Sequence, residues 1–540
     1  MNRGIESVAA AGNWWRDAVI YHVYVRSFAD SNADGVGDLP GVLGRLDYLR
    51  GGTTSLDVDA VWLSPFFPSP QADFGYDISD YLAVDPVYGT LDDLTRLIEK
   101  CHERGIRVLI DLVFNHTSTA HPWFLESRSS RNNPKRDWYF WRPPAGDGGP
   151  PNNWLSAFRN VGNAWTWDSR TAEYYMNSFT AEQADLNMRN PEVRGAVLDI
   201  ARTWLERGVD GFRLDVVHRL MKDPLLSDNP PELAAAPRHV SHPTLRQHNF
   251  DHPDVLDLLA EIRALVDRYG AVTVGEVPIH DHRRLARYYG IQRPGLHMVF
   301  TFGLWDLPWE AAAFRGEVES IENALPEAGW PCYALANHDI PRVTDRYDDA
   351  GQGDARARVA AVFLLTARGT PCIYQGEEIG LKPPLALSAA TGPDVDGRDR
   401  SRTPMQWDAD GTGFSRISPW LPFGVDVEHR NVTFQAGRAD SILALYRRLI
   451  GLRKQSPALR RGRYQTATAP AGAYAYWRTH PAERLFIALN FTAREQEMDC
   501  GAERVRPMLS TLDPTPRVRA GHFVLRPHEA VIVRCEGDRG

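Results

Sequence analysis

Short apolar segments alternate with amphipathic segments along most of this chain. The apolar segments are five to eight residues long and predict strands at residues 18–25, 60–64, 107–114, 210–217, 272–277, 297–303, 332–337 and 371–375. Helical patterns separate most of them; in residues 91–104, for example, Leu94, Leu97, Ile98 and Cys101 recur on one helical face. Eight strands with helical crossovers predict an α/β protein built on a (β/α)8 TIM barrel, whose chemistry lies at the C-terminal ends of the strands.

Three stretches depart from this alternation. Residues 117–180 are rich in Pro, Gly, Asn and Trp and are too long for an ordinary loop, so they predict a small domain inserted after the third strand. Residues 381–430 form a second long loop, and from residue 466 strand-like runs follow one another without a helical pattern. We therefore expect a catalytic barrel at 1–116 and 181–465, an inserted domain at 117–180 and a C-terminal antiparallel β-sandwich at 466–540.

Acidic side chains stand at the ends of three predicted strands. They are Asp215 in GFRLDVV, Glu276 in VTVGEV and Asp339 in YALANHD. Arg213 lies two residues before Asp215 and so on the same face of its strand, where a cation favours the ionised carboxylate. An ionised carboxylate in a dry pocket is a nucleophile suited to a sugar carbon. Three acids on three strand ends predict a site that cleaves glycosides.

Composition and charge exclude several other classes of protein. A hydrophobic content of 43% and a charged content of 24% are usual for a globular protein, while a net charge of −8 without basic runs argues against a nucleic-acid partner. No stretch approaches ~18 consecutive apolar residues, and the N-terminus lacks an apolar signal region, so we expect a cytoplasmic protein that does not bind membranes. The five widely spaced cysteines predict buried free thiols.

Seven segments carry a resemblance to a known family. They are DAVIYHVYVRSFADSNADGVGD, AVWLSPFFPSPQADFGYDISDY, DLVFNH, GFRLD, VGEV, NHD and RTPMQW. In this order they resemble the α-amylase superfamily of retaining glycosidases (glycoside hydrolase family 13), and within it the α-glucosidase and oligo-1,6-glucosidase group. The resemblance extends from Trp14 to about residue 450 and is weaker beyond.

The resemblance implies roles for the three acids. Asp215 would be the nucleophile, Glu276 the general acid and base, and Asp339 the residue that stabilises the transition state. These roles agree with the reaction, because cleavage with retained anomeric configuration needs one carboxylate that attacks the sugar and one acid that protonates the leaving oxygen.

The resemblance also implies a set of substrate-binding residues. His116 and His338 would donate to sugar hydroxyls, Asp73 would bind the far end of the sugar, and Tyr76 would stack on its ring. Arg402 would face Asp73 and close the pocket, which implies removal of one glucose at a time. The remaining members are Arg213 beside the nucleophile, Phe158, Phe179 and Gln183 from the inserted domain, and Val216, whose branched side chain resembles that of enzymes favouring α-1,6 links.

One loop after the first strand is a candidate metal site. Asp30, Asn32, Asp34 and Asp38 place side-chain oxygens at alternate positions around a glycine turn, and the carbonyl of Val36 completes the set. Oxygen ligands in this pattern suit a hard cation. In the family such a loop holds Ca²⁺ or Mg²⁺ structurally, and no organic cofactor is expected.

These observations predict a retaining, exo-acting α-glucosidase. It would hydrolyse short α-glucosides such as maltose, isomaltose or sucrose from the non-reducing end, with or without transfer to a sugar acceptor, as a monomer or homodimer. Two alternatives stay open: a glucosyl-transferring or isomerising relative of the trehalose synthase or sucrose isomerase type, and a catalytically silent binding homologue. The linkage preference is also open, because His218 replaces the Asn of the usual DVIN sequence.

Overall fold

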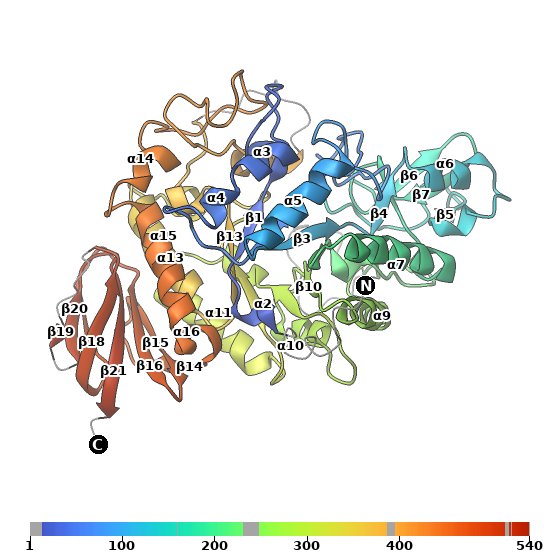
Figure 1. Cartoon of the computed structure of the whole chain (residues 1–540). Helices are drawn as coiled ribbons and strands as arrows, with labels where there is room; N and C mark the ends of the chain where they lie inside the picture. Colours follow the sequence, from blue (N-terminus) through green and yellow to red (C-terminus); the bar gives the residue numbers. More distant parts are fainter. Residues whose placement is uncertain are drawn as a thin grey trace.

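Eight parallel strands close into a barrel at the centre of the molecule (Figure 1). The computed structural model describes residues 13–158, 160–230, 248–385, 395–512, 518–519 and 521–538. The barrel strands, in their order around the barrel, are β1 (Ile20–Val23), β13 (Thr370–Tyr374), β12 (Pro331–Ala334), β11 (Met298–Phe300), β10 (Val272–Gly275), β9 (Gly211–Leu214), β3 (Arg107–Leu112) and β2 (Ala60–Leu63). The predicted (β/α)8 barrel is confirmed, and all eight strands lie within or overlap the predicted segments.

Helices follow the barrel strands and cover the barrel from outside (Figure 1). The helix predicted at 91–104 is α5 (Leu91–Glu103). It begins at Thr90 because the Thr90 and Asp93 side chains each accept a hydrogen bond from the other's backbone amide. The other helices are α2 (Trp14–Asp17), α3 (Leu39–Gly44), α4 (Leu46–Leu49), α7 (Pro191–Glu206), α9 (Val255–Asp267), α10 (His282–Ala286), α11 (Ala311–Ala324), α12 (Val343–Arg346), α13 (Gly353–Thr366), α14 (Val432–Ala436), α15 (Ile442–Gln455) and α16 (Pro457–Arg461).

The chain between β3 and α7 forms a small unit beside the barrel (Figure 1). It contains α6 (Pro122–Ser129) and a three-stranded sheet with the order β5 (Trp141–Arg142), β7 (Glu173–Met176) and β6 (Trp165–Asp168). Two further strands, β4 (His116–Ser118) and β8 (Gln183–Asp185), pair antiparallel where the chain leaves the barrel and returns. The unit has a small core of its own that includes Phe140, Trp154 and Trp165.

The C-terminal part is an antiparallel sandwich on the opposite side of the barrel (Figure 1). Its larger sheet has the order β14 (Arg463–Ala467), β15 (Ala473–His480), β16 (Glu483–Asn490), β21 (Ala530–Asp538) and β18 (Ala502–Ser510). The smaller sheet has the order β17 (Gln496–Asp499), β20 (His522–Leu525) and β19 (Val518–Arg519). Trp477 and Phe486 of the larger sheet pack with Met498 and Phe523 of the smaller one. The sandwich begins at β14, three residues before the predicted boundary.

The predicted long loop at 381–430 contains one short helix in the part that the structure describes. This is the 3-10 helix η9 (Val395–Ser401); residues 386–394 of the loop lie outside the described residues. The loop lies at the C-terminal end of β13 and so at the face of the barrel where the predicted acids lie.

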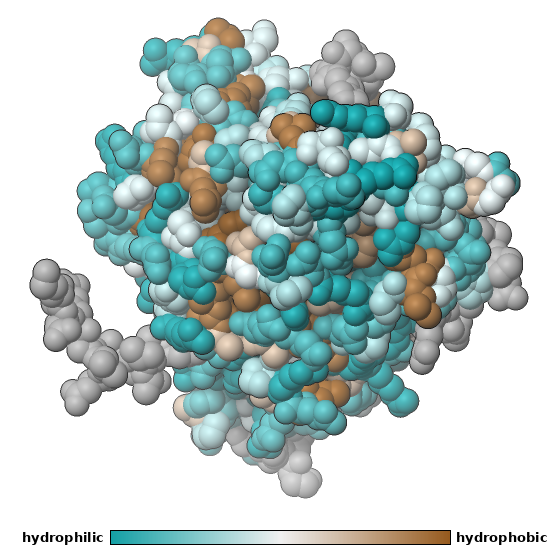
Figure 2. Space-filling model, turned by 90° about the vertical axis from the view of Figure 1, so that its right-hand side faces the viewer, coloured by the Kyte–Doolittle hydropathy of each residue, from teal (hydrophilic) through white to brown (hydrophobic). Residues whose placement is uncertain are grey.

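The surface is mostly hydrophilic, and its apolar side chains form separate small groups on the face that Figure 2 shows. Among the described residues, no helix has the length and apolar character needed to cross a bilayer. Cys101, Cys332 and Cys372 are buried free thiols, as predicted, and Cys500 and Cys535 are buried with their Sγ atoms 3.8 Å apart.

Buried arginines attach the last helices and the sandwich to the barrel. On α15, the Nη1 and Nη2 atoms of Arg453 donate to the carbonyls of Leu365 and Gly369, at 3.1 and 2.5 Å. On β15, Arg478 donates from Nη2 to the carbonyl of Gly462 at 3.1 Å and from Nη1 to that of Thr366. Burial lowers the pKa of Arg453 to about 9, so these carbonyls compensate a costly charge.

We therefore expect Arg453→Met to lower the free energy of unfolding by about 2 kcal/mol, because two buried carbonyls lose their donor while the cost of burying a charge is removed. Denaturant unfolding measures this loss, and Arg96→Met on the exposed face of α5 is the control, with an expected change within about 0.5 kcal/mol. Equal stability of the two variants would contradict the role of Arg453.

Candidate active site

Strand register brings the central charged residues together. β3, β9 and β10 are neighbours in the barrel, and Asp111 of β3 lies directly opposite Arg213 of β9. Asp215 follows the last residue of β9, and Glu276 follows the last residue of β10. Because adjacent parallel strands end at the same face, the loops that follow them start side by side.

Arg213 joins three carboxylates. Its Nη1 donates to Oδ1 of Asp111 at 2.7 Å and to Oδ1 of Asp215 at 2.5 Å, and its Nη2 donates to Oε2 of Glu276. Asp111 is held from its other side, since its Oδ2 accepts from Nε1 of Trp62 at 2.8 Å. We call Asp111, Arg213, Asp215 and Glu276 the central cluster.

Burial controls the protonation of this cluster. It raises the pKa of Asp215 well above its usual value, and the charge of Glu276 raises it further, although Arg213 opposes both effects. Burial also raises the pKa of Asp111 to about 6. Arg213 lowers the pKa of Asp215, as expected, but burial has the larger and opposite effect. Three carboxylates around one guanidinium disfavour full ionisation of the cluster, and glycoside cleavage needs a proton.

Asp339 has a different environment. Its Oδ1 accepts from Nη2 of Arg402 at 2.6 Å and from Nη1 of Arg398 at 3.2 Å, and its Oδ2 lies 3.4 Å from Nε2 of His338. These cationic and polar partners hold the pKa of Asp339 well below its usual range, against the effect of burial. Asp339 is therefore a fixed negative charge beside the central cluster.

The two predicted histidines are neutral. Burial lowers the pKa of His338 to about 3 and also lowers that of His116. The His338 ring stacks between Tyr76 and Tyr24, at centroid distances of 5.3 and 5.5 Å. A neutral imidazole can donate a hydrogen bond to a hydroxyl without adding a charge.

Asp73 forms the centre of a second group of polar side chains. Its Oδ1 accepts from Nη2 of Arg398 at 2.6 Å, and its Oδ2 accepts from Nε2 of Gln183 at 3.1 Å. Gln183 also lies 3.0 Å from Nε2 of His116. The expected pairing of Arg402 with Asp73 is wrong: Arg398, one helical turn earlier in the same loop, pairs with Asp73, while Arg402 donates to Asp339 and to the carbonyl of His338.

Aromatic side chains of the inserted unit extend this group. The Arg398 guanidinium lies 4.8 Å from the ring centre of Phe158, Phe158 lies 5.3 Å from Phe179, and Phe179 lies 5.2 Å from His116. The predicted substrate-binding residues of the insertion thus contact those of the barrel.

Val216 has a strained backbone directly after Asp215. Its φ of 37° lies in the left-handed region, which branched residues rarely adopt. In this conformation its amide nitrogen lies 3.3 Å from Oε2 of Glu276, so the strain places a donor beside that carboxylate.

The candidate metal loop is an Asp-rich turn. Both carboxylate oxygens of Asp30 accept backbone N–H groups, including those of Ala33 and Gly35 at 2.7 and 2.9 Å, while Asp38 caps α3 by accepting from Gly41 at 2.6 Å. No three Asp, Glu, His or Cys side chains converge as metal ligands anywhere in the described ranges. A cation would therefore need the Asn32 side chain and the Val36 carbonyl as well, the donor set that the sequence predicts.

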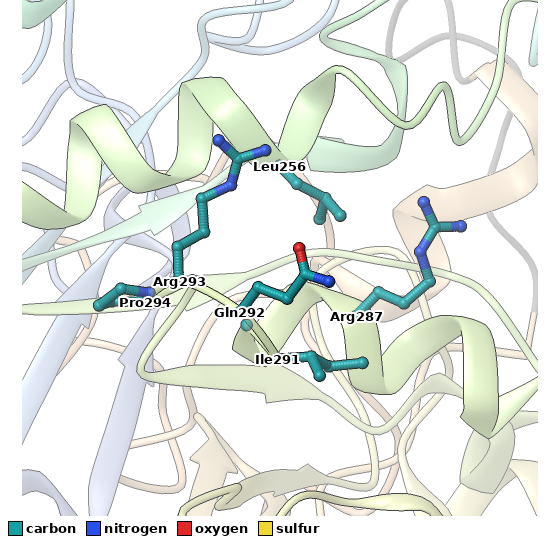
Figure 3. Close-up of a pocket in the computed structure, with 8 residues that line it drawn as sticks. Leu256, Arg287, Ile291, Gln292, Arg293 and Pro294 are labelled. Carbon is teal, nitrogen blue, oxygen red and sulfur yellow. The ribbon is translucent and has the colours of Figure 1, made fainter.

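A separate cavity of about 220 Å³ lies beside α9 and contains none of the predicted residues. Figure 3 shows Arg287 and Arg293 on either side of Gln292 in its wall. Arg293 forms an ion pair with Asp257.

Three residues of the site were missed in the sequence. Asp111 carried a signal, because it is an acid within an otherwise apolar strand, RVLIDL. Trp62 could not be distinguished from a core residue. Arg398 and Arg402 lie in the same arginine-rich loop, and nothing in the sequence shows which of them pairs with Asp73.

Comparisons with known proteins identify the family. The model of the α-amylase catalytic domain matches residues 22–462. A probable α-glucosidase of Rhizobium meliloti (strain 1021) is 41% identical over 92% of each chain, and relatives named oligo-1,6-glucosidase are 34–38% identical. The chain belongs to the α-amylase superfamily of glycoside hydrolases.

Two solved structures are similar to the whole chain. An α-glucosyl transfer enzyme has a TM-score of 0.89 and 41% identity, covering 97% of this chain and 99% of that one. Isomaltulose synthase from Klebsiella sp. LX3 has a TM-score of 0.89 and 33% identity, with the same coverage.

The low pKa of Asp339 predicts a pH dependence of stability. A carboxylate whose pKa is depressed by folding stabilises the protein above its unfolded pKa of about 4, and this stabilisation is lost as the pH falls below that value. Asp339→Asn should therefore melt below the wild type at pH 7, and the difference should shrink below pH 4. Calorimetry between pH 3 and 7 measures this, with exposed Asp92→Asn as the control; a difference that does not change with pH would contradict it.

Proposed function

We propose that this protein is a retaining, exo-acting α-glucosidase that hydrolyses short α-glucosides from their non-reducing ends. The observation that carries the proposal is the shared contact of Asp215 and Glu276 with Arg213. Two carboxyl groups bound to one guanidinium lie close together, which favours the separation of roughly 5–5.5 Å in retaining enzymes over the 6.5–9.5 Å of inverting ones.

The mechanism requires one proton within the central cluster. Asp215 attacks the anomeric carbon as a carboxylate, so this proton must lie on Glu276 in the complex with substrate. Glu276 then protonates the leaving oxygen, and in the second step it takes a proton from the water that releases glucose. Arg213 stays hydrogen-bonded to Asp215 and Asp111. The fixed charge of Asp339 stabilises the positive charge that develops on the sugar.

The second group of polar side chains supports cleavage from a chain end. Arg398 and Gln183 fix Asp73, and Asp73 offers acceptors to the hydroxyls at the far end of one glucose. Because Phe158, Phe179 and Arg398 enclose this end, a longer chain would have no way out beyond it. Tyr76 and His338 would line the ring and the hydroxyls of the bound glucose, and the strained Val216 would narrow the side of the leaving group.

Transfer of the glucosyl group to a second sugar is the alternative to hydrolysis. It uses the same residues, and the similarity to an α-glucosyl transfer enzyme and to isomaltulose synthase favours it as a second activity. The product pattern described below also tests which of α-1,4, α-1,6 and sucrose-type bonds the enzyme prefers.

The loop of Asp30, Asn32, Asp34, Val36 and Asp38 is proposed to bind Ca²⁺ or Mg²⁺. All its donors are oxygens, as hard cations prefer, and Asp38 links the loop to α3. When bound, the cation would stabilise the fold and take no part in catalysis. A cytoplasmic location and a monomeric or homodimeric state stay predictions of the sequence.

The product pattern tests the proposed function. In a panel of maltose, isomaltose, sucrose, trehalose and maltotriose, each substrate that is cleaved should release glucose with its α configuration retained, as followed by NMR, because the pocket holds one glucose and the displacement occurs twice. Maltoheptaose blocked at its non-reducing end should resist. Asp215→Asn is the control and should lose nearly all activity while keeping its fold. Internal cleavage of the blocked substrate would show an open cleft and contradict the proposal.

Removal of the cation should affect stability more than chemistry. A ligand that binds only the folded chain stabilises it by mass action, so a chelator should lower the melting temperature while protein that remains folded keeps its kcat. Asp34→Ala should abolish the effect of Ca²⁺ on melting. Immediate inactivation by the chelator without any change in melting would refute the structural role.

A further inference from the structure

Two cysteines lie side by side in the core of the C-terminal sandwich. Cys500 follows the last residue of β17, a strand of the smaller sheet, and Cys535 lies on β21 of the larger sheet. Cys535 donates a hydrogen bond from its Sγ to the Sγ of Cys500 at 3.8 Å. The two residues are 35 positions apart in the sequence, so it is the fold that brings these sulfur atoms together.

The backbone holds both cysteines of this pair in place. The amide of Cys500 donates to the carbonyl of Gly521 at 3.0 Å, which attaches Cys500 to the segment that leads into β20. Directly after Cys500, Gly501 turns the chain from β17 toward β18 with a φ of 67°, a conformation that glycine adopts without strain. Cys535 lies opposite Val505 of β18 in the antiparallel register. The two sulfur atoms therefore meet at a fixed place between the two layers of the sandwich.

The environment of Cys500 differs from that of the three cysteines in the barrel part of the chain. Those three are Cys101, Cys332 and Cys372, and burial raises the pKa of each of their thiols. At Cys500 the hydrogen bonds from the Cys535 thiol and the Ala502 amide favour the thiolate and lower the pKa, against the effect of burial. Because the thiolate is the nucleophile in thiol chemistry, Cys500 is the more reactive cysteine.

A small reagent can reach this pair more easily than the other thiols. The exposed fraction is 6% for Cys500 and 7% for Cys535, against 0, 0 and 2% for the three cysteines of the barrel part. Up to Arg534, β21 pairs with both β16 and β18, whereas from Cys535 to Asp538 its pairing within the described residues is with β18. A strand segment that is paired on one side opens at a lower free-energy cost than one paired on both.

We propose that Cys500 and Cys535 are a redox-sensitive pair, which a small disulfide such as oxidised glutathione converts into a disulfide bond between the two layers of the sandwich. The reaction is a thiol–disulfide exchange in two steps. The Cys500 thiolate attacks one sulfur of the reagent, whose sulfur–sulfur bond breaks, and one reagent thiolate leaves. The Cys535 thiol then loses its proton, attacks the Cys500 sulfur and displaces the second reagent thiolate. The two cysteines give up two electrons and two protons, and the reagent takes them up as two thiols.

The bond would stabilise the fold without touching the candidate active site. A disulfide bond is about 2.05 Å long, so rotation of the two side chains must bring the sulfur atoms closer than they are in the thiol form. The bond then closes a loop that the unfolded chain otherwise leaves open, which stabilises the folded state. The sandwich lies on the side of the barrel opposite the inserted unit (Figure 1), so we expect glucoside cleavage to be the same in the thiol and disulfide forms.

The test treats the folded, full-length protein with oxidised glutathione and then counts its thiols. After removal of the reagent and unfolding in denaturant, an alkylating reagent should label all five cysteines of untreated protein and two fewer in treated protein. Mass spectrometry of the peptides should find Cys500 linked to Cys535. The melting temperature should rise by roughly 3 °C or more, because the bond constrains the unfolded chain. Dithiothreitol should reverse each of these changes.

Three variants separate the roles of the cysteines. Cys535→Ser lacks the second thiol, so the reaction should stop at a mixed disulfide between Cys500 and glutathione. Cys500→Ser lacks the attacking thiolate and should take up glutathione several-fold more slowly than Cys535→Ser. Cys372→Ser is the matched control, since it removes a buried thiol of the barrel, and it should form the Cys500–Cys535 bond as the wild type does. Melting temperatures of the untreated variants report whether the fold is kept.

Several outcomes would overturn the inference. Five alkylated cysteines after treatment of the folded protein, or a bond that includes a cysteine of the barrel part, would show that the pair is not the site of oxidation. A Cys500–Cys535 bond that forms only in denaturant would show that the fold does not present the two thiols to each other. A lower melting temperature of the disulfide form would show that the bond strains the sandwich. Failure of the proposed function is distinct, because it concerns glucose release by the untreated protein.

Discussion

The site depends on one buried guanidinium that serves three carboxylates. In the absence of Arg213, the carboxylates of Asp111, Asp215 and Glu276 would repel one another in a region of low dielectric. With it, they are fixed at the ends of neighbouring strands and share one compensating charge. The barrel makes this possible, because parallel strands in register present Asp111 and Arg213 opposite each other.

The surroundings of the cluster shift the pKa values of neighbouring acids differently. Burial and the charge of Glu276 raise the pKa of Asp215, whereas His338, Arg398 and Arg402 lower the pKa of Asp339. The pKa values of two acids in one pocket are thus shifted in opposite directions. The arginines that produce this difference come from the loop after the last barrel strand, so formation of the pocket depends on closure of the whole barrel.

The inserted unit and the last loop complete the site from opposite ends of the catalytic part. Phe158 and Gln183 come from the insertion, and Arg398 lies more than two hundred positions later in the chain. Gln183 and Arg398 both donate to Asp73, and the Arg398 guanidinium lies over the ring of Phe158. Binding of a sugar therefore requires the relative position of the insertion and the barrel to be fixed. The antiparallel pair β4 and β8 fixes it where the chain leaves the barrel and returns.

The sequence by itself determined the barrel, the insertion, the sandwich and the three acids, because these depend on local signals. Strand periodicity, helix caps such as Thr90 and acids at strand ends can each be recognised from a few neighbouring residues. Only the tertiary structure decided that Arg398 pairs with Asp73, that Asp111 anchors Arg213, and that burial raises the pKa of Asp215. Each of these depends on which distant side chains share a desolvated volume. The spacing of residues along the chain does not specify that volume, since it forms only when the strands close and the loops pack over them.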